Sequence, residues 1–238
     1  MAVKIIGYLS YGYPDLETSI RRAQVYRAGG CRCIEVDLPT NDPYLDNAFI
    51  QSRMKAAYAA CADFGVYFDG VEQIKARCPD TELIALCYEH TVIQIGVETF
   101  IRRFRQAGLD ALILVGNRDD RVKKQLLAAG IKISSYVTYA LPDAEVEDAK
   151  TANGFVYLQA KPDGAVRPGC ETLAQCVSYL RQSGIQAPIY CGVGVSTPQD
   201  VREIREAGGD GAFIGSALLK QPSEEETVRY LRALAEQA

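Results

Sequence analysis

The chain lacks several features that would place it in common functional classes. Lysine and arginine number 26 against 30 acidic residues, so the formal net charge of −4 provides no basic excess for a nucleic-acid partner. No apolar run reaches the roughly 18 residues of a membrane-spanning helix, and the N-terminal residues do not resemble a signal peptide. There is one histidine, His90, and no Cys-x-x-Cys pair, which excludes a finger-like zinc site. We therefore expect no metal, no nucleic acid and no membrane partner.

The eight cysteines allow two interpretations. An even number is compatible with disulfides, but that pattern is typical of short secreted chains. Most of these cysteines lie within apolar runs, such as residues 86–88 and 189–191. We expect reduced, mostly buried thiols in a cytoplasmic protein.

Short β-branched runs alternate with longer amphipathic stretches along all 238 residues. The expected strands are 4–10, 33–38, 82–88, 111–115, 132–138, 154–159, 188–191 and 211–214. The expected helices include 16–28, 49–64, 97–107, 121–129, 173–183 and 198–207. Eight strand–helix units of about 30 residues predict one (β/α)₈ barrel domain over residues 1–238, a TIM barrel. An open doubly wound sheet is the alternative, although residues 10–14 after the first strand lack its GxGxxG fingerprint.

The last two units carry a pattern typical of phosphate binding. Residues 192–198 follow the seventh strand, and Gly215 and Ser216 follow the eighth. The glycines, including Gly194, allow the backbone to approach a ligand, and the Gly215-Ser216 amides would begin a short helix whose N-terminus attracts an anion. Loops seven and eight are the usual phosphate site of this fold. The alternative is two glycine-rich turns that close ordinary units.

Carboxylates gather in the second unit. Glu35 lies inside an apolar strand, where burial would raise its pKa and suit it to general acid–base work. The polar loop 39–47 that follows contains a second candidate, Asp46. The alternative is a solvated loop in which Asp42 or Asp46 caps the helix that begins near residue 49.

These residues resemble a known family signature. Residues 34–51 read Ile-Glu-Val-Asp-Leu-Pro-Thr-Asn-Asp-Pro-Tyr-Leu-Asp-Asn-Ala-Phe-Ile-Gln. They are similar to Glu-Leu-Gly-x-Pro-Phe-Ser-Asp-Pro-x-Ala-Asp-Gly-Pro-x-Ile-Gln of the tryptophan synthase alpha subunit family. The segments 12–19, 157–158, 192–196 and 215–217 fall in register with the same family. The resemblance covers nearly the whole chain, apart from the family's N-terminal helix.

The resemblance implies a lyase that splits indole-3-glycerol phosphate into indole and glyceraldehyde 3-phosphate without a cofactor. Glu35 matches the catalytic glutamate, Asp46 the aspartate that holds the indole N–H, and Tyr157 the tyrosine that positions the substrate. The implied phosphate ligands are Gly164, Gly194, Gly215 and Ser216. The aryl pocket expected from strand-end positions consists of Tyr8, Leu86, Ile113 and Val193, where Tyr8 adds a hydroxyl to the family's phenylalanine. A beta subunit is the partner that the family implies.

Departures from the family pattern lie mainly in the loops. The family's Gly-x-Thr-Gly after strand six is replaced by residues 161–169, where Lys161 and Arg167 could meet the phosphate. His90 stands where the family has a partner-facing asparagine, and it is either a solvated residue or a contact. Three functions stay open: a divergent alpha subunit, a stand-alone paralogue acting on a related phosphate ester, or a non-catalytic phosphate-ligand binder. Because a binder has little reason to keep Glu35 beside Asp46, the two carboxylates disfavour the third function.

Overall fold

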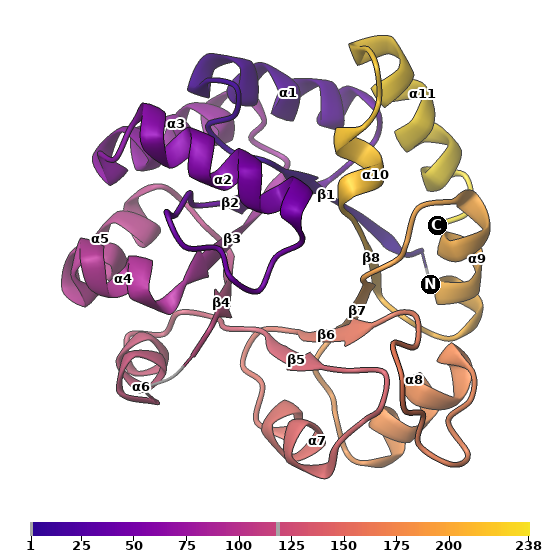
Figure 1. Ribbon diagram of the computed structural model, residues 1–238. Coiled ribbons are helices and arrows are strands. Elements are labelled where there is room, and N and C mark those ends of the chain that lie inside the picture. The colour runs from indigo at the N-terminus through magenta and orange to yellow at the C-terminus, as the bar shows by residue number, and fades with distance from the viewer. Residues whose placement is uncertain (1, 118–119) are drawn as a thin grey trace. The chain divides into compact units, whose positions relative to one another are not determined.

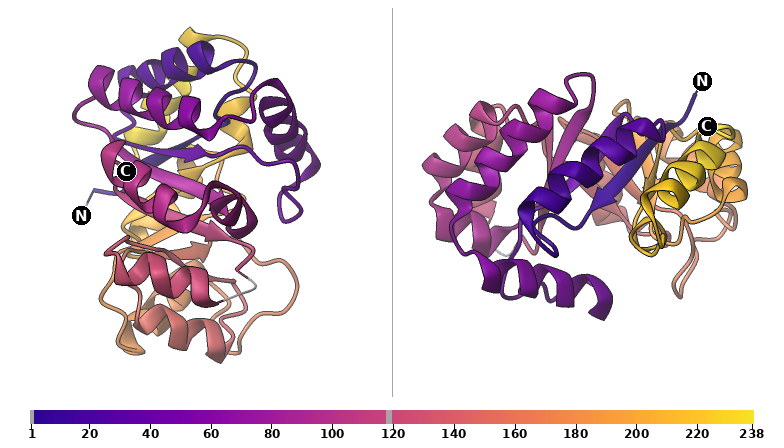
Figure 2. Two further views of the ribbon diagram at one scale, coloured as in Figure 1. Left: turned by 90° about the vertical axis from the view of Figure 1, so that its left-hand side faces the viewer. Right: turned by 90° about the horizontal axis from the view of Figure 1, so that it is seen from above.

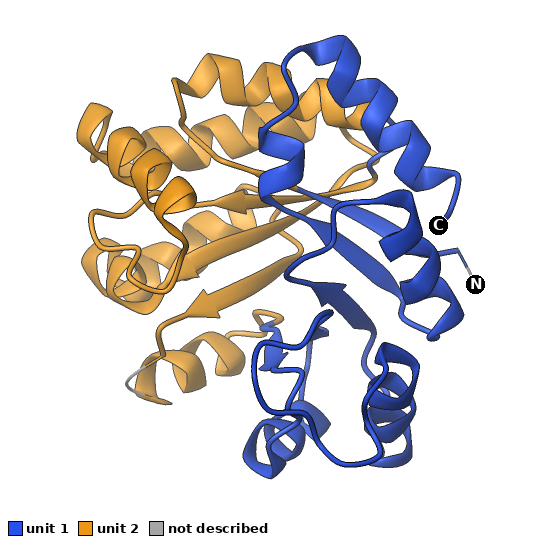
Figure 3. Ribbon diagram, turned by 45° about the vertical axis from the view of Figure 1, so that its right-hand side comes forward, with its two compact units in different colours: residues 1–7, 29–31, 133–238 blue, residues 8–28, 32–132 orange. Residues whose placement is uncertain are grey.

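The computed structural model describes residues 2–117 and 120–238, in which strands and helices alternate (Figure 1). Two compact units are distinguished in Figure 3. The N-terminal unit comprises residues 8–28 and 32–132, and the C-terminal unit comprises residues 1–7, 29–31 and 133–238. The prediction of a single domain over residues 1–238 stays a prediction.

The eight parallel strands follow the order β4-β3-β2-β1-β8-β7-β6-β5 in one sheet. Their bounds are β1 Lys4–Leu9, β2 Cys33–Asp37, β3 Glu82–Tyr88, β4 Ala111–Val115, β5 Ser135–Val137, β6 Val156–Gln159, β7 Ile189–Gly192 and β8 Gly211–Ile214. Strand–helix alternation with sequentially neighbouring parallel strands confirms the predicted (β/α)₈ fold class. The carboxyl ends of the strands are therefore where the candidate residues should gather.

The helices connect these strands. Their bounds are α1 Leu16–Ala28, α2 Ala48–Ala60, α3 Phe64–Arg77, α4 Glu89–Ile95, α5 Val97–Gln106, α6 Asp120–Ala128, α7 Asp143–Lys150, α8 Leu173–Gln182, α9 Pro198–Glu206, α10 Ser216–Leu219 and α11 Glu224–Ala235. In the N-terminal unit α1 packs against α3, as Figure 2 also shows. In the C-terminal unit α9 packs against both α8 and α11. In the part of the chain that the structure describes, none of these helices has the length and apolar character that crossing a membrane requires.

Two expected elements differ most from the structure. The single helix predicted over residues 49–64 is two helices, because the backbone at Cys61 is extended and Asp63 caps α3 by accepting a hydrogen bond from the Gly65 amide at 2.8 Å. The strand predicted over 132–138 is only Ser135–Val137, and the Ile133 amide donates to the Asn153 side chain at 2.9 Å. Both differences arise from side chains that compete with backbone pairing.

Each unit has its own aromatic core. In the N-terminal unit Phe68 and Phe100 are buried edge to face, with ring centroids 6.0 Å apart. In the C-terminal unit Phe213 stacks on Tyr157 at 4.4 Å and also contacts Phe155 at 5.9 Å. All eight cysteines are free thiols and seven are buried, which confirms the expected burial.

Candidate active site

A row of side chains crosses three neighbouring strands in the N-terminal unit. Asp37 at the end of β2 is in register with Leu86 on β3, which is in register with Ile113 on β4. Glu35 lies two residues before Asp37 on the same face of β2, because side chains alternate along a strand. The predicted aryl residues Leu86 and Ile113 therefore lie in one row with Asp37, a carboxylate two residues from Glu35.

Glu35 is buried, with 5% of its surface exposed. Burial raises the pKa of its carboxyl well above the ordinary value, and the charges of Asp37 and Asp46 raise it further. A raised pKa favours the protonated carboxyl, which is the form that a general acid requires. The geometry is consistent with the role expected for Glu35.

Asp37 is a carboxylate of the site that was not predicted. It has no exposed surface, and it accepts hydrogen bonds from the Tyr8 hydroxyl and the Tyr11 amide. Burial raises its pKa well above the ordinary value, although both hydrogen bonds act in the opposite direction. The signal that could have revealed Asp37 is present in the sequence, since it stands where the family signature has glycine.

Asp46 is held in the loop after β2 by the hydroxyl of Tyr88. That hydroxyl donates to Oδ2 of Asp46 at 2.6 Å and accepts from the Leu45 amide at 3.1 Å. Burial raises the pKa of Asp46, whereas the bond from Tyr88 lowers it. The helix cap that the sequence left open to Asp42 or Asp46 is Asn47, which accepts from the Phe49 and Ile50 amides. Asp46 therefore directs its side chain to Tyr88 rather than to a helix end.

The loop after β2 is further packed by an aromatic group of the same unit. Tyr44 lies against Tyr88 and His90, with ring centroids 5.5 and 6.5 Å away. His90 belongs to α4, and its Nε2 lies 2.7 Å from the Thr40 hydroxyl. His90 is thus a packed residue within the chain and not a solvated loop residue. The segment that carries Asp46 is therefore packed against residues of β3 and α4.

In the C-terminal unit, Tyr157 reaches the end of the neighbouring strand. Its ring stacks on Phe213, and a Cβ at Gly192 on β7 would lie 2.1 Å from the Tyr157 hydroxyl oxygen. No other residue could replace Gly192 without displacing this ring. The glycine at the end of β7 therefore serves the placement of Tyr157, a purpose that the sequence did not reveal.

The next turn approaches Lys161. Gly194 has a φ of +85°, and a Cβ there would lie 3.0 Å from Cδ of Lys161. Nζ of Lys161 pairs with Asp200 at 2.7 Å, and the Ser196 and Thr197 amides donate to the same carboxylate at 2.8 Å. The ammonium group of Lys161, which could meet a phosphate, is thus paired with the Asp200 carboxylate.

Between these glycines lies Val193, which has a φ of +63° and is 50% exposed. A β-branched residue in this left-handed region is strained, and such strain often accompanies function. The predicted place of Val193 in an aryl pocket stays a prediction.

Gly215 immediately precedes α10, as expected for the short helix after β8. A Cβ built at Gly215 would meet no atom within 4 Å, so the backbone there is accessible to a ligand. Ser216 is the first residue of α10, and β7 and β8 are neighbouring strands. The two glycine loops therefore leave the same edge of the sheet, whereas Gly164 is exposed in the loop after β6 with no atom within 4 Å of a built Cβ.

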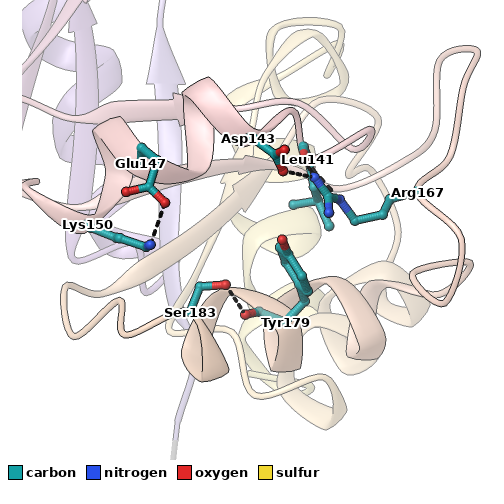
Figure 4. Close-up of polar contacts among 7 residues, drawn as sticks. All are labelled: Leu141, Asp143, Glu147, Lys150, Arg167, Tyr179 and Ser183. Carbon is teal, nitrogen blue, oxygen red and sulfur yellow. Dashed lines mark hydrogen bonds and ion pairs between the residues drawn. The ribbon is translucent and has the colours of Figure 1, made fainter.

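Arg167 fastens the far end of the loop after β6 (Figure 4). Its Nε and Nη2 donate to the Leu141 carbonyl at 3.1 and 2.8 Å, and Nη2 also pairs with Asp143. The guanidinium lies 4.7 Å from the centroid of the Tyr179 ring. Arg167, which by its place in the sequence could meet a phosphate, links this loop to Leu141 and Asp143 after β5.

The structure places the predicted residues in two groups. The N-terminal unit holds Tyr8, Glu35, Asp46, Leu86 and Ile113, and the C-terminal unit holds Tyr157, Gly164, Val193, Gly194, Gly215 and Ser216. Sequence reasoning missed Asp37, Tyr88 and Asp200, and the last two carry no local pattern that indicates a site.

Comparison with known proteins identifies the family. The family model described as tryptophan synthase alpha chain matches residues 2–237. The tryptophan synthase alpha chain of Cyanothece sp. (strain PCC 7425 / ATCC 29141) is 29% identical and covers 98% of this chain, which spans 88% of that protein. That of Methanopyrus kandleri is 27% identical over 94% of this chain and 82% of its own length.

Solved structures agree on the fold. A tryptophan synthase structure from M. tuberculosis has a TM-score of 0.83 at 22% identity and covers 99% of this chain and 93% of its own. The alpha subunit from Campylobacter jejuni has a TM-score of 0.81 at 24% identity and covers 98% and 95%. Because the family model spans nearly all of the residues, the chain belongs to the tryptophan synthase alpha chain family.

Proposed function

We propose that Glu35, Asp46 and Tyr157 carry out the reaction of this family, the cleavage of indole-3-glycerol phosphate to indole and glyceraldehyde 3-phosphate. The observation that carries the proposal is the pair of carboxylates in the N-terminal unit. Glu35 is buried and has a raised pKa, and Asp46 is held by Tyr88 in an ordered loop. The proposal assigns the proton to Glu35 and the charge to Asp46, which the hydrogen bond from Tyr88 favours against the effect of burial.

The proposed chemistry gives Glu35 two proton transfers and Asp46 the stabilisation of a charge. Glu35 gives its proton to C3 of the indole ring, and the positive charge that develops at the ring nitrogen is stabilised by ionised Asp46. The bond between C3 and the glycerol carbon then breaks, and its electron pair returns to the ring. The hydroxyl on that carbon becomes the aldehyde carbonyl, and its proton goes to the Glu35 carboxylate. Glu35 ends the cycle protonated, and Tyr157 helps to position the substrate.

The decisive experiment is the release of indole from indole-3-glycerol phosphate by the purified chain, alone and with a tryptophan synthase beta subunit from the same organism. Cleavage that depends on Glu35 supports the proposal. Absence of cleavage under both conditions, with retained binding of phosphate esters, would indicate a paralogue with another substrate or a phosphate-ligand binder.

Phosphate should stabilise the chain. Glycerol 3-phosphate at millimolar concentration is expected to raise the melting temperature, because a ligand that binds only the folded state shifts the equilibrium by about 2.7 kcal/mol at a hundredfold excess over its Kd. Gly215→Val should abolish the shift, since the new side chain would fill the open space in front of that backbone. Thermal unfolding measures both, with glycerol and sodium chloride as controls. An unchanged shift in the variant would refute the assignment of Gly215.

The contacts of Arg167 predict that the lyase activity of the chain depends only weakly on a beta subunit. The family typically binds a beta subunit, and closure over the substrate excludes water. Here Lys161 and Arg167 already fasten both ends of the loop after β6, and Tyr88 and His90 order the loop after β2. The wild type should therefore be stimulated less than a typical family member.

Arg167→Ala should lower the activity of the chain alone by several fold and increase its stimulation by the beta subunit. Lys150→Ala is the matched control, since it removes an exposed ion pair with Glu147 on neighbouring α7 (Figure 4). Titration with the beta subunit during indole release measures the effect. A large saturable activation of the wild type at a one-to-one ratio would contradict this prediction.

A further inference from the structure

Asp37 is a buried carboxylate at a position where the family signature has no side chain. It has no exposed surface and lies two residues from Glu35 on one face of β2. Burying a second carboxyl beside a first costs folding free energy unless hydrogen bonds compensate for the lost hydration. Tyr8, which donates to Asp37, stands where the family has phenylalanine, so carboxyl and hydroxyl depart from the family together.

The surroundings of Asp37 and Glu35 differ in one respect. Asp37 accepts hydrogen bonds on both oxygens, on Oδ2 from the Tyr8 hydroxyl and on Oδ1 from the Tyr11 amide. Among the described residues, no donor reaches the Glu35 carboxyl. Hydrogen bonds from donors stabilise the ionised form of a carboxyl, whereas burial without donors stabilises the neutral form. Asp37 is thus the better of the two sites for a negative charge.

Other titratable groups of the N-terminal unit do not cancel this difference. Tyr8 comes from β1, Asp46 from the loop after β2, Tyr88 from β3, Arg53 from α2 and His90 from α4. Asp46 adds a like charge that acts on both Glu35 and Asp37. Arg53 lies over the Tyr13 and Phe49 rings, and His90 contacts Thr40. Within residues 8–28 and 32–117, no lysine or arginine forms an ion pair with any of the three carboxylates.

We propose that Asp37 is a positioning residue that takes up the charge of the buried carboxyl pair, through the Tyr8 hydroxyl and the Tyr11 amide, and thereby leaves the proton on Glu35. Two carboxyls in one buried site do not both ionise readily, and the one with donors ionises first. This inference rests on the proposed function, in which Glu35 must begin the reaction protonated. Asp37 has no exposed surface and so acts through Glu35 rather than on the substrate.

The direct test is the protonation of Glu35 itself, followed by carboxyl carbon NMR of glutamate-labelled protein, with Glu35→Gln to assign the resonance. In the wild type Glu35 should be protonated at neutral pH. In Asp37→Asn it should titrate lower by about one pH unit or more, the usual size of the effect of a nearby like charge. An unchanged titration in Asp37→Asn overturns the proposal.

The pH profile gives a second readout. Activity that needs protonated Glu35 falls as the pH rises through the pKa of that group. Asp37→Asn should therefore move the alkaline limb of kcat/KM to lower pH, with a loss of about tenfold at alkaline pH and a much smaller loss at acid pH. The control Glu98→Gln removes one charge from an exposed position at the start of α5 and should leave the limb in place.

Tyr8→Phe tests the same inference if Asp37→Asn does not fold. This variant removes a hydrogen-bond donor to Asp37 but keeps the Asp37 carboxyl. Glu35 and Asp37 then share the proton more evenly, so Glu35 should titrate at lower pH, as in Asp37→Asn, but by a smaller amount. No movement in this variant overturns the proposal. The NMR titration needs no substrate. A lower titration of Glu35 in Tyr8→Phe therefore supports the role of Asp37 even if indole-3-glycerol phosphate is not cleaved. Absence of cleavage would refute only the lyase function.

Discussion

Glu35→Gln is expected to lower kcat for indole-3-glycerol phosphate cleavage by about 10²–10⁴-fold, the range typical of a general acid–base group. Glutamine keeps the shape of the side chain but has no proton to exchange with C3 or with the glycerol hydroxyl. Glu35 is buried and accepts no hydrogen bond from the described residues, so the substitution should disturb packing little. KM should change by less than a few fold, because the lost interaction belongs to the transition state.

Steady-state rates of indole release, together with the melting temperature of each variant, measure this effect. Glu98→Gln is the matched control, because it makes the same chemical change at an exposed position of α5 in the same unit and should retain full activity. Glu35→Gln at a rate within a few fold of the wild type would show that the lyase mechanism assigned to Glu35 is wrong.

Asp46→Asn is expected to lower kcat by about 10²–10³-fold, the size found when one preorganised group that stabilises a developing charge is removed. Asparagine can still accept the hydrogen bond that the Tyr88 hydroxyl makes at 2.6 Å, so the loop after β2 should keep its conformation. The loss should appear in kcat rather than in binding, since the positive charge at the indole nitrogen develops only as C3 is protonated.

Tyr88→Phe separates the charge of Asp46 from its placement. The bond from Tyr88 lowers the pKa of Asp46 against the effect of burial, so its removal should raise that pKa. Asp46 works in its ionised form, so the activity that needs it is lost as the pH falls through its pKa. The acid limb of the pH profile should therefore move to higher pH in Tyr88→Phe.

The outcome that would contradict the role of Asp46 is an activity of Asp46→Asn comparable to that of the wild type. That result would remove Asp46 from the mechanism.

The fold was predictable from local pattern, and so was the burial of Glu35, because this residue lies inside an apolar run. Strands β3, β4 and β8 begin and end where the apolar runs predict, since a buried parallel strand reads as a continuous apolar segment. Helix ends were less predictable. The break between α2 and α3 depends on Asp63 acting as a cap, which residue spacing does not distinguish from a solvated aspartate.

The partners of the site residues required the structure. Lys161 and Arg167 carry the charge that a phosphate attracts, but Asp200 pairs with the first, and Leu141 and Asp143 hold the second. Tyr88 precedes His90 by two residues and gives no sign in sequence that its hydroxyl reaches Asp46. Charge is visible in a sequence, whereas the group that neutralises it comes from another element.

The sequence alone determined the strand–helix alternation, the Glu35–Asp46 spacing and the glycine loops, because these arise from hydrophobic periodicity and from residue types within one unit of about 30 residues. Only the tertiary structure decided that Asp37 is wholly buried beside Glu35, that Tyr8 and Tyr11 donate to it, and that Gly192 makes room for Tyr157. The physical reason is that burial, hydrogen bonding and close approach are properties of neighbouring strands. They set the pKa of a carboxyl, and the neighbours that donate to Asp37 are 26 and 29 residues from it in the chain.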